Sequence, residues 1–313
     1  MTYAHSWPRL APWVFVRLLA VLSASATAAS AQDLVPGAFT PAPVGFNVLT
    51  MGTVFSGGGV AFDPTLPITD ATATIGGAFV GWGRTFSLAG RYANTGVALP
   101  LAAGHVEGLV FDQFQEASRR GLADTSIRFA INIYGAPAMT PREFASYRAS
   151  TTVSAGLTVL APTGQYDSNR YINLGTNRWA FKPAIAFTRT RGRWTFEGDL
   201  ATLFFSANPD YVGSRRQQSP IVELQGHLIY TIRPGFWVAA DGNYWDGGRV
   251  TTDGRRAGLK QQNSRVGATL AMPIRRQQVR VAYSFGAYTR LGGDYHSVGL
   301  SYTYAWAAGR WWR

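Results

Sequence analysis

The chain has 313 residues, with 29 Lys and Arg against 17 Asp and Glu, which gives a formal net charge of +12. Charged residues make up only 15 % of it, against about 25 % in ordinary soluble domains, while glycine and aromatic residues are plentiful. This composition argues against a disordered chain and against a highly solvated surface, and the absence of cysteine excludes disulfide bonds.

The first 31 residues have the pattern of a secretory signal peptide. Arg9 and Arg17 precede the apolar run L-L-A-V-L-S-A-S-A-T-A (18–28), and Ala29-Ser30-Ala31 offers small residues for cleavage. A soluble N-terminal helix is the alternative interpretation. No later apolar run reaches about 18 residues, so we expect no transmembrane helix. We predict a signal peptide at 1–31, a periplasmic segment at 32–44 and one outer-membrane barrel at 45–313.

Alternation of large apolar residues with polar or small ones recurs along the chain from residue 45 onward. Each alternating segment has roughly 9 to 13 residues, which suits a tilted strand crossing a bilayer, whereas soluble strands mostly have about 5–6. Successive side chains of a strand point to opposite faces, so each segment has one apolar and one polar face. The clearest segments are 127–133, 179–188, 193–204, 222–232, 265–272, 278–285 and 298–306.

Residues 57–135 are harder to divide, because S-G-G-G-V (56–60) and G-W-G-R (81–84) obscure the strand boundaries. About thirteen strand candidates follow residue 45, and a barrel with both ends in the periplasm has an even number of strands. We therefore predict about twelve strands, and about 10–14 would fit the pattern. Residues 137–148 differ: Thr140 can cap a helix, Pro141 suits its first turn and Glu143 completes a capping box. We expect a short helix there.

The connections alternate in length. R-T-R-G-R (189–193), R-P-G (233–235) and P-I-R-R-Q (273–277) are tight turns, whereas the polar loops near 163–177, 206–218 and 247–262 are longer. Outer-membrane barrels place short turns on the periplasmic side and long loops outside. The pattern predicts an all-β, transmembrane, antiparallel up-and-down β-barrel in the outer membrane of a Gram-negative cell.

The last strand, V-G-L-S-Y-T-Y-A-W (298–306), carries large residues on one face only. In lipid every backbone N–H and C=O needs an internal partner, so this strand must close the barrel against the first. Tyr302, Tyr304 and Trp306 are expected in the aromatic girdle at the membrane interface. Outer-membrane lipid, lipopolysaccharide and the barrel-assembly machinery are the expected partners, although Arg313 displaces the usual terminal aromatic residue.

Several ordered motifs resemble one family. They are A-P-T-G-Q-Y-D (161–167), I-N-L-G-T-N-R-W-A-F-K-P (172–183), R-W-T-F-E-G-D (193–199), L-Q-G-H-L-I-Y-T (224–231), F-W-V-A-A-D-G-N-Y-W-D-G-G-R (236–249) and R-L-G-G-D-Y (290–295). Over roughly 45 to 306 the chain is similar to the phenol-degradation meta-pathway family of outer-membrane proteins, often called "transporter". The resemblance implies a transmembrane β-barrel and a transport role, and it supplies no catalytic residues.

The strand phase predicts which polar side chains face the lumen, because Arg or Lys on the lipid face near the midplane costs about 2–4 kcal/mol. The lumen-lining candidates are Arg128, Arg178, Lys182, Arg193, Glu197, Asp199, Glu223, Gln225, His227, Arg265 and Arg280. One interpretation is a lumen that attracts an anionic or aromatic acid solute. The other is a network of arginine–carboxylate pairs that stiffens the barrel, which the mixed signs favour; both hold if unpaired arginines remain.

Enzyme, metal and nucleic-acid sites find little support. His227 shares a face with Glu223 and Gln225, and we interpret it as a structural hydrogen-bond partner in preference to a pH-sensitive gate. A hydrolase needs a serine beside a histidine base, and the mature chain has only His105, His227 and His296, without a G-x-S-x-G motif. Metal-binding motifs are missing as well, so we expect no cofactor. The arginines are scattered, so no nucleic-acid partner is expected.

A barrel of about twelve strands is small enough for inward side chains and loops to narrow its lumen. We therefore predict a transporter or channel for passive uptake of small compounds, with aromatic compounds among the candidate solutes. Loop 163–177, with Tyr166 and Tyr171, is a candidate mouth or else part of the girdle. The alternatives are a non-conducting structural or surface barrel and, less favoured, an outer-membrane hydrolase.

Overall fold

The computed structural model describes residues 34–61, 68–148, 150–256, 258–275 and 277–307. The predicted signal peptide, residues 1–31, lies outside these ranges and stays a prediction. Within them, no helix is both long enough and apolar enough to cross a membrane.

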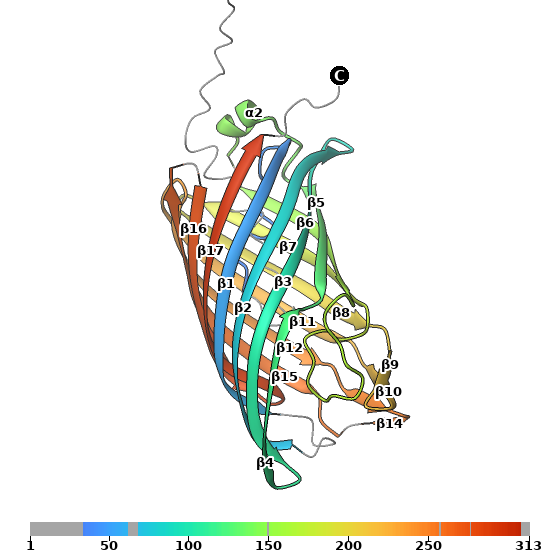
Figure 1. The fold of residues 1–313 in the computed structure, drawn as a ribbon. Coiled ribbons are helices and arrows are strands. Elements are labelled where there is room, and N and C mark those ends of the chain that lie inside the picture. The colour runs from blue at the N-terminus through green and yellow to red at the C-terminus, as the bar shows by residue number, and fades with distance from the viewer. Residues whose placement is uncertain (1–33, 62–67, 149, 257, 276, 308–313) are drawn as a thin grey trace, which may run out of the picture.

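Twelve strands close into one antiparallel barrel, as the alternation predicts (Figure 1). In order around the wall these strands are β1 (Phe46–Ala61), β2 (Ile68–Leu88), β3 (Arg91–Val110), β5 (Thr125–Tyr134), β6 (Thr151–Ala161), β7 (Ala180–Arg191), β8 (Trp194–Phe205), β11 (Ile221–Arg233), β12 (Phe236–Gly247), β15 (Gln261–Ile274), β16 (Gln277–Thr289) and β17 (Gly292–Ala307). The last strand pairs with the first, from Phe46 opposite Ala307 to Ala61 opposite Gly292, so the expected closure is confirmed.

In the region 57–135, one long strand of the wall is interrupted and appears as two shorter strands. β4 (Gln113–Leu122) pairs with the second half of β3, and β5 pairs with its first half. Only Ala123 and Asp124 separate β4 from β5, and the Ala123 N–H still donates to the Pro100 carbonyl. β4 and β5 are therefore two halves of one long strand, which takes a single position in the wall.

Two predicted loops, 206–218 and 247–262, contain a second sheet, which their sequence pattern did not indicate. Its strands are β9 (Asn208–Tyr211), β10 (Ser214–Gln218), β13 (Val250–Thr252) and β14 (Arg255–Arg256). Both hairpins turn at a pair with positive φ, Val212-Gly213 and Asp253-Gly254. Asp-Gly is a strong hairpin signal, so this sheet was partly predictable. It lies at the end of the barrel opposite the tight turns, which we call the loop end (Figure 1).

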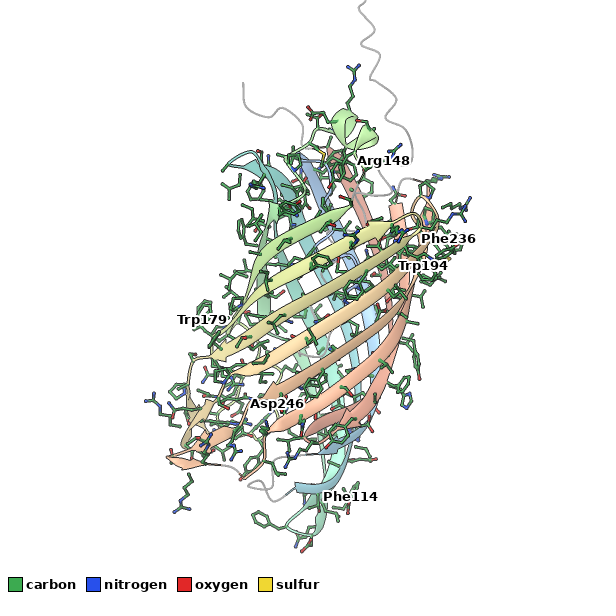
Figure 2. The ribbon with its side chains drawn as sticks, turned by 180° about the vertical axis from the view of Figure 1, so that it is seen from behind. Phe114, Arg148, Trp179, Trp194, Phe236 and Asp246 are labelled. Atoms are coloured by element: carbon green, nitrogen blue, oxygen red, sulfur yellow. The ribbon has the colours of Figure 1, made fainter. Side chains whose placement is uncertain are left out.

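The outer and inner faces of the wall differ in polarity. Large exposed apolar side chains cover the outside, including Phe181, Ile185, Phe187, Trp194, Phe196, Leu200, Leu224, Leu228, Val298 and Leu300. Buried polar side chains face the lumen on the same strands. Figure 2 shows Trp194 and Phe236 near the turn end, and Phe114 and Asp246 toward the loop end. An apolar exterior around a polar interior is the arrangement of a barrel that stands in lipid.

The short helix α2 (Pro141–Ser146) lies at the turn end, in the connection between β5 and β6, as predicted. Thr140 and Glu143 form the expected capping box. The Glu143 N–H donates to the Thr140 hydroxyl, and the Thr140 N–H donates to the Glu143 carboxylate. Phe144 packs with Ala136 and Met139 at the turn end. The Met139 carbonyl accepts a hydrogen bond from the Val44 N–H, so this connection holds the chain that enters β1.

Candidate functional site

Residues 34–40, which we call the inner segment, cross the lumen before the chain reaches β1. Phe39 lies against Gly156 of β6, where an added Cβ would stand 3.0 Å from the ring. Leu34 lies in the same way against Gly267 of β15, with 3.0 Å between its Cδ1 and the position of an added Cβ. β6 and β15 are five strands apart around the wall. Residues 34–40, which belong to the segment predicted as periplasmic (32–44), therefore lie inside the barrel, where Leu34 and Phe39 pack against wall glycines.

Glu197 of β8 holds the backbone of the inner segment. One carboxylate oxygen accepts the N–H groups of Gly37 and Ala38, each at 3.1 Å, and the other accepts the Thr40 hydroxyl at 3.4 Å. The Glu197 side chain is completely buried. A buried carboxylate is stable only when its oxygens accept such bonds, so the barrel and the segment satisfy each other.

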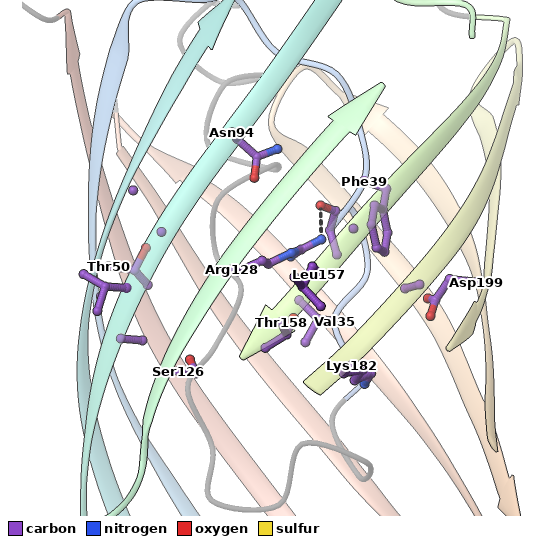
Figure 3. A pocket seen from close by; sticks show the side chains of 18 of the residues that line it. Val35, Phe39, Thr50, Asn94, Ser126, Arg128, Leu157, Thr158, Lys182 and Asp199 are labelled. Atoms are coloured by element: carbon purple, nitrogen blue, oxygen red, sulfur yellow. Dashed lines mark hydrogen bonds between the residues drawn. The ribbon is translucent and has the colours of Figure 1, made fainter. Parts of the chain in front are cut away.

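Two arginines bind carbonyl groups of the same segment. Arg128 of β5 donates to the Ala38 carbonyl at 2.8 Å, and its guanidinium stacks 4.6 Å from the Phe39 ring centroid (Figure 3). Arg280 of β16 donates to the Pro36 carbonyl at 3.4 Å and lies over the Trp237 ring. The inner segment is thus held by one anion and two cations from three strands.

A row of buried polar side chains continues from Glu197 across the neighbouring strands of the wall. His227 stands directly opposite Glu197 on one side and opposite Asp241 on the other. His227 Nδ1 lies 2.8 Å from one oxygen of Asp241, and the Thr269 hydroxyl donates to the other oxygen at 2.7 Å. Both side chains are buried. This supports the structural interpretation of His227, with Asp241 as a partner that the sequence analysis did not name.

Further pairs fill the neighbouring rows. Lys182 Nζ lies 2.5 Å from one carboxylate oxygen of Glu223, and the other oxygen accepts a hydrogen bond from the Gln225 side chain. Arg265 Nη2 donates to the hydroxyls of Ser284 and Ser297 at 3.1 and 3.2 Å, and to the Tyr295 carbonyl at 2.9 Å. The charged pairs described here join carboxylates to Lys182 and His227, whereas these hydrogen bonds of Arg265 go to neutral groups. The predicted network of arginine–carboxylate pairs stays a prediction.

Two cavities flank the inner segment. One has a volume of about 120 Å³ and is lined by Val35, Phe39, Arg128, Lys182 and Asp199, among others (Figure 3). The other has about 230 Å³ and lies between the inner segment and the wall formed by β1 to β3 and β15 to β17. Val35 lines both, so the segment separates them.

The structure places nine of the eleven lumen candidates on inward positions of wall strands; these are Arg128, Lys182, Glu197, Asp199, Glu223, Gln225, His227, Arg265 and Arg280. Arg193 has the right phase but precedes β8, so it is exposed at the turn end instead of lining the lumen. Arg178 precedes β7 and contacts Gln218 of the second sheet and the Phe205 ring. Burial, together with the charge of Arg216, lowers the pKa of Arg178 to about 10.

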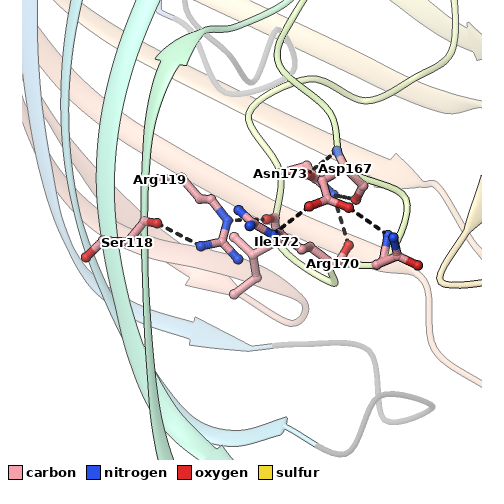
Figure 4. Close-up of polar contacts among 7 residues, drawn as sticks. Ser118, Arg119, Asp167, Arg170, Ile172 and Asn173 are labelled. Atoms are coloured by element: carbon pink, nitrogen blue, oxygen red, sulfur yellow. Dashed lines mark hydrogen bonds and ion pairs between the residues drawn. The ribbon is translucent and has the colours of Figure 1, made fainter.

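The loop between β6 and β7 folds over the edge of β4, at the mouth of the loop end. Asp124 accepts the N–H groups of Gly164 and Thr176, both at 2.9 Å. Arg119 of β4 donates to the Ile172 carbonyl, close to an Asp167–Arg170 ion pair of 2.7 Å (Figure 4). Tyr166 and Tyr171 are tied to β9 through the Asp210 carbonyl and the Tyr211 hydroxyl. The two tyrosines therefore belong to a hydrogen-bonded loop at the loop end, and their role in a mouth stays a prediction.

The predicted girdle residues lie on the outside of β17, near the turn end. Tyr302 and Tyr304 are exposed, and Trp306 is half-buried and stacks on Tyr304 with 5.6 Å between ring centroids. Their position suits an interfacial belt, and the role stays a prediction.

One serine–histidine contact lies outside the lumen, on the hairpin of β3 and β4. His105 Nδ1 is 2.9 Å from the Ser118 hydroxyl, and Glu116 is 3.9 Å from Nε2. A hydrolytic triad needs the acid within hydrogen-bond distance of the histidine, about 2.6–3.2 Å. The contact is also open to solvent, so these three residues do not assemble a hydrolase site.

Comparison with solved structures places the fold among outer-membrane proteins. An outer-membrane channel from Pseudomonas putida F1 superposes with a TM-score of 0.73 at 18 % identity, covering 88 % of this chain and 100 % of the other. The β-domain of the Bordetella autotransporter BrkA, at 10 % identity, covers 82 % of this chain and 98 % of its own, and its TM-score of 0.47 adds no argument. Comparison with curated protein sequences finds no significant match.

A family model matches residues 28–304, which is most of the chain and includes all twelve wall strands up to Tyr304. It also includes the inner segment, Glu197 and the two arginines that hold it. The protein therefore belongs to the family described as "Putative MetA-pathway of phenol degradation".

Proposed function

We propose that the protein is an outer-membrane channel for passive uptake of small compounds, aromatic compounds among them. The apolar exterior and polar interior of the closed wall support a position in the membrane. The family description refers to phenol degradation, and the similar fold from Pseudomonas putida is that of a channel. The barrel-assembly machinery and lipopolysaccharide are proposed partners on the strength of the C-terminal strand and the exterior surface.

The observation that carries this proposal is the space beside the inner segment. Cavities of about 120 and 230 Å³ remain on its two sides, and their linings combine a larger apolar part with hydroxyl and charged groups. A barrel that served only as a scaffold could fill this space with larger side chains, because protein interiors otherwise pack closely. The remaining volume suits small solutes and excludes large ones.

A non-conducting barrel is the second candidate, and the hold on the inner segment favours it. Glu197, Arg128 and Arg280 together bind four backbone groups and one hydroxyl of residues 36–40. Such charge-assisted bonds are roughly twice as strong as neutral ones. A segment held in this way would block the lumen if solutes needed its complete removal.

Flux into liposomes that contain the full chain separates the two candidates. We expect benzoate to enter faster than arabinose, a sugar of similar mass, because the cavities are narrow and largely apolar. Entry of neither solute through a folded, heat-modifiable barrel would contradict the channel and leave the non-conducting barrel. Neutralising Arg128 or Arg280 is a poor test of solute selection, because both residues hold the inner segment.

A further inference from the structure

The larger cavity, of about 230 Å³, has two chemically different walls. It follows β17 from Tyr295 to Ser301, a distance of about 20 Å at the usual rise per strand residue. Arg265, Ser284 and Ser297 line one side. The apolar residues around it are Leu34, Val35, Pro36, Val54, Ile75, Phe79 and Pro100.

The polar wall is suited to an anion. Arg265 is oriented by the serine hydroxyls that accept from its Nη2, and the Ser56 and Ser297 hydroxyls lie 2.8 Å apart beside it. Guanidinium groups and hydroxyls both donate to carboxylates, and the planar guanidinium matches a carboxylate especially well. Arg280 adds a second positive charge to the lining. The one acid there, Asp241, already accepts bonds from His227 and Thr269, so it opposes an anion only in part.

The apolar wall and the volume are suited to one aromatic ring. An apolar cavity of about 150 Å³ accommodates the six carbons of benzene, so about 230 Å³ suits the nine non-hydrogen atoms of benzoate and falls short of the thirteen of 2-naphthoate. Phe79 is buried and faces this cavity, which gives the solute an aromatic surface to pack on. Three residues of the inner segment complete the wall, so the segment forms part of the site.

We propose that this cavity binds a single-ring aromatic carboxylate, with the carboxylate toward Arg265 and the ring between Phe79 and the inner segment. The inference depends on the proposed channel function, because it names the solute class and the place where that solute is held. It also gives the inner segment a second role: its Leu34, Val35 and Pro36 select the solute as well as narrowing the lumen.

Calorimetric titration of the full chain in lipid nanodiscs tests the site with three probes of stated chemistry. Benzoate is expected to bind saturably, and benzyl alcohol, which keeps the ring without the charge, at least tenfold more weakly. 2-Naphthoate, which keeps the charge on two fused rings, is expected not to bind. Equal affinity for benzoate and benzyl alcohol would overturn the role of Arg265, and tight binding of naphthoate would overturn the size limit.

Two variants locate the binding. Arg265→Gln should lower benzoate affinity at least tenfold and leave benzyl alcohol unchanged. Ala282→Phe places a ring in the cavity from the inward face of β16 and should abolish binding of both probes. Val281→Phe is the matched control, since Val281 is the neighbouring residue on the exposed face. If Arg265→Gln fails to fold, Ala282→Phe still decides: benzoate affinity equal to that of the wild type would overturn the proposal.

The binding and flux measurements distinguish a failure of the proposed site from a failure of the proposed channel function. Benzoate flux without saturable binding at this cavity would contradict the site and leave the channel in place. Saturable binding that Ala282→Phe abolishes, without flux, would support the site and contradict the channel function.

Discussion

The two sides of the lumen are built from different side chains. Where β7, β8, β11 and β12 form the wall, long charged or amide side chains point inward, and several are completely buried. Where β1, β2 and β17 form it, the inward residues are mostly small; they include Thr50, Gly52, Val54, Ser56, Gly77, Gly81, Ser297, Gly299 and Ser301. The inner segment is bound through Glu197 on the first side, and the larger cavity remains on the second.

This difference shows how one lumen can both hold a segment and keep space. Long polar side chains reach across the lumen, and they are stable there only when paired or hydrogen-bonded. Small residues cannot reach the segment and leave a volume beside it. We therefore expect the charged side to determine stability and the small-residue side to determine which solutes fit.

The largest expected effect is on the charged side. His227→Ala should destabilise the barrel by about 3–5 kcal/mol, because it leaves the buried Asp241 carboxylate with only the Thr269 hydroxyl. Urea unfolding of the protein in lipid vesicles measures this loss. Leu228→Ala, on the exposed face of the same strand, is the control. A loss below about 1 kcal/mol for His227→Ala would show that the charged side does not determine stability.

Glu197→Ala should release the inner segment while the barrel stays closed. The N–H groups of Gly37 and Ala38 lose their acceptor, and a buried donor without a partner costs about 1–3 kcal/mol. We expect proteolysis within residues 34–44 and a faster flux of arabinose. Thr188→Val is the control, because Thr188 stands opposite Glu197 on β7. Unchanged proteolysis would show that other contacts suffice to hold the segment.

Gly156→Ala should loosen only the Phe39 end. The added Cβ would lie 3.0 Å from the Phe39 ring, and such overpacking costs about 1–3 kcal/mol. Hydrogen exchange of the Ala38 and Phe39 amides should become faster than in the wild type. Gly226→Ala, at a wall glycine with nothing within 4 Å of an added Cβ, should leave exchange unchanged. Equal exchange in the two variants would contradict the close packing of the Phe39 ring against Gly156.

The smallest effect lies outside the lumen, at the cap of α2. Hydrogen bonds from the Thr140 backbone and side chain hold the pKa of Glu143 below its ordinary value. A lowered folded-state pKa means that this cap stabilises α2 above the unfolded pKa and is lost as the pH falls through the folded pKa. The protection factor of the Thr140 amide, which is its exchange rate corrected for the intrinsic pH dependence, should fall as the pH falls through that acidic range, and Glu143→Gln should remove this fall. A protection factor that stays constant over the same range would contradict the cap.

Much of the fold could be predicted from the sequence, because alternation is visible wherever one face is apolar and the other polar. Glu197 and His227 were found in this way, since Phe196 and Leu228 beside them are plainly lipid-facing. Asp241 was missed because its strand has apolar residues on both faces: Trp237 and Trp245 point inward and are buried, while Val238 points outward.

The inner segment could not be predicted by the same reasoning. Its position depends on contacts with strands more than a hundred residues away, such as those of Glu197 with Gly37 and Ala38. Residues 34–40 show neither alternation nor a motif that announces such partners. The resemblance of the strands indicated the family, and only the structure shows what lies inside the barrel.

Single-channel conductance in planar bilayers tests the central claim most directly, by comparing the wild type with a chain that lacks residues 34–40. The inner segment occupies the lumen between β6 and β15, so we predict a small conductance for the wild type and a several-fold increase after the deletion. Equal conductance in the two proteins would contradict the claim that this segment controls the passage through the barrel.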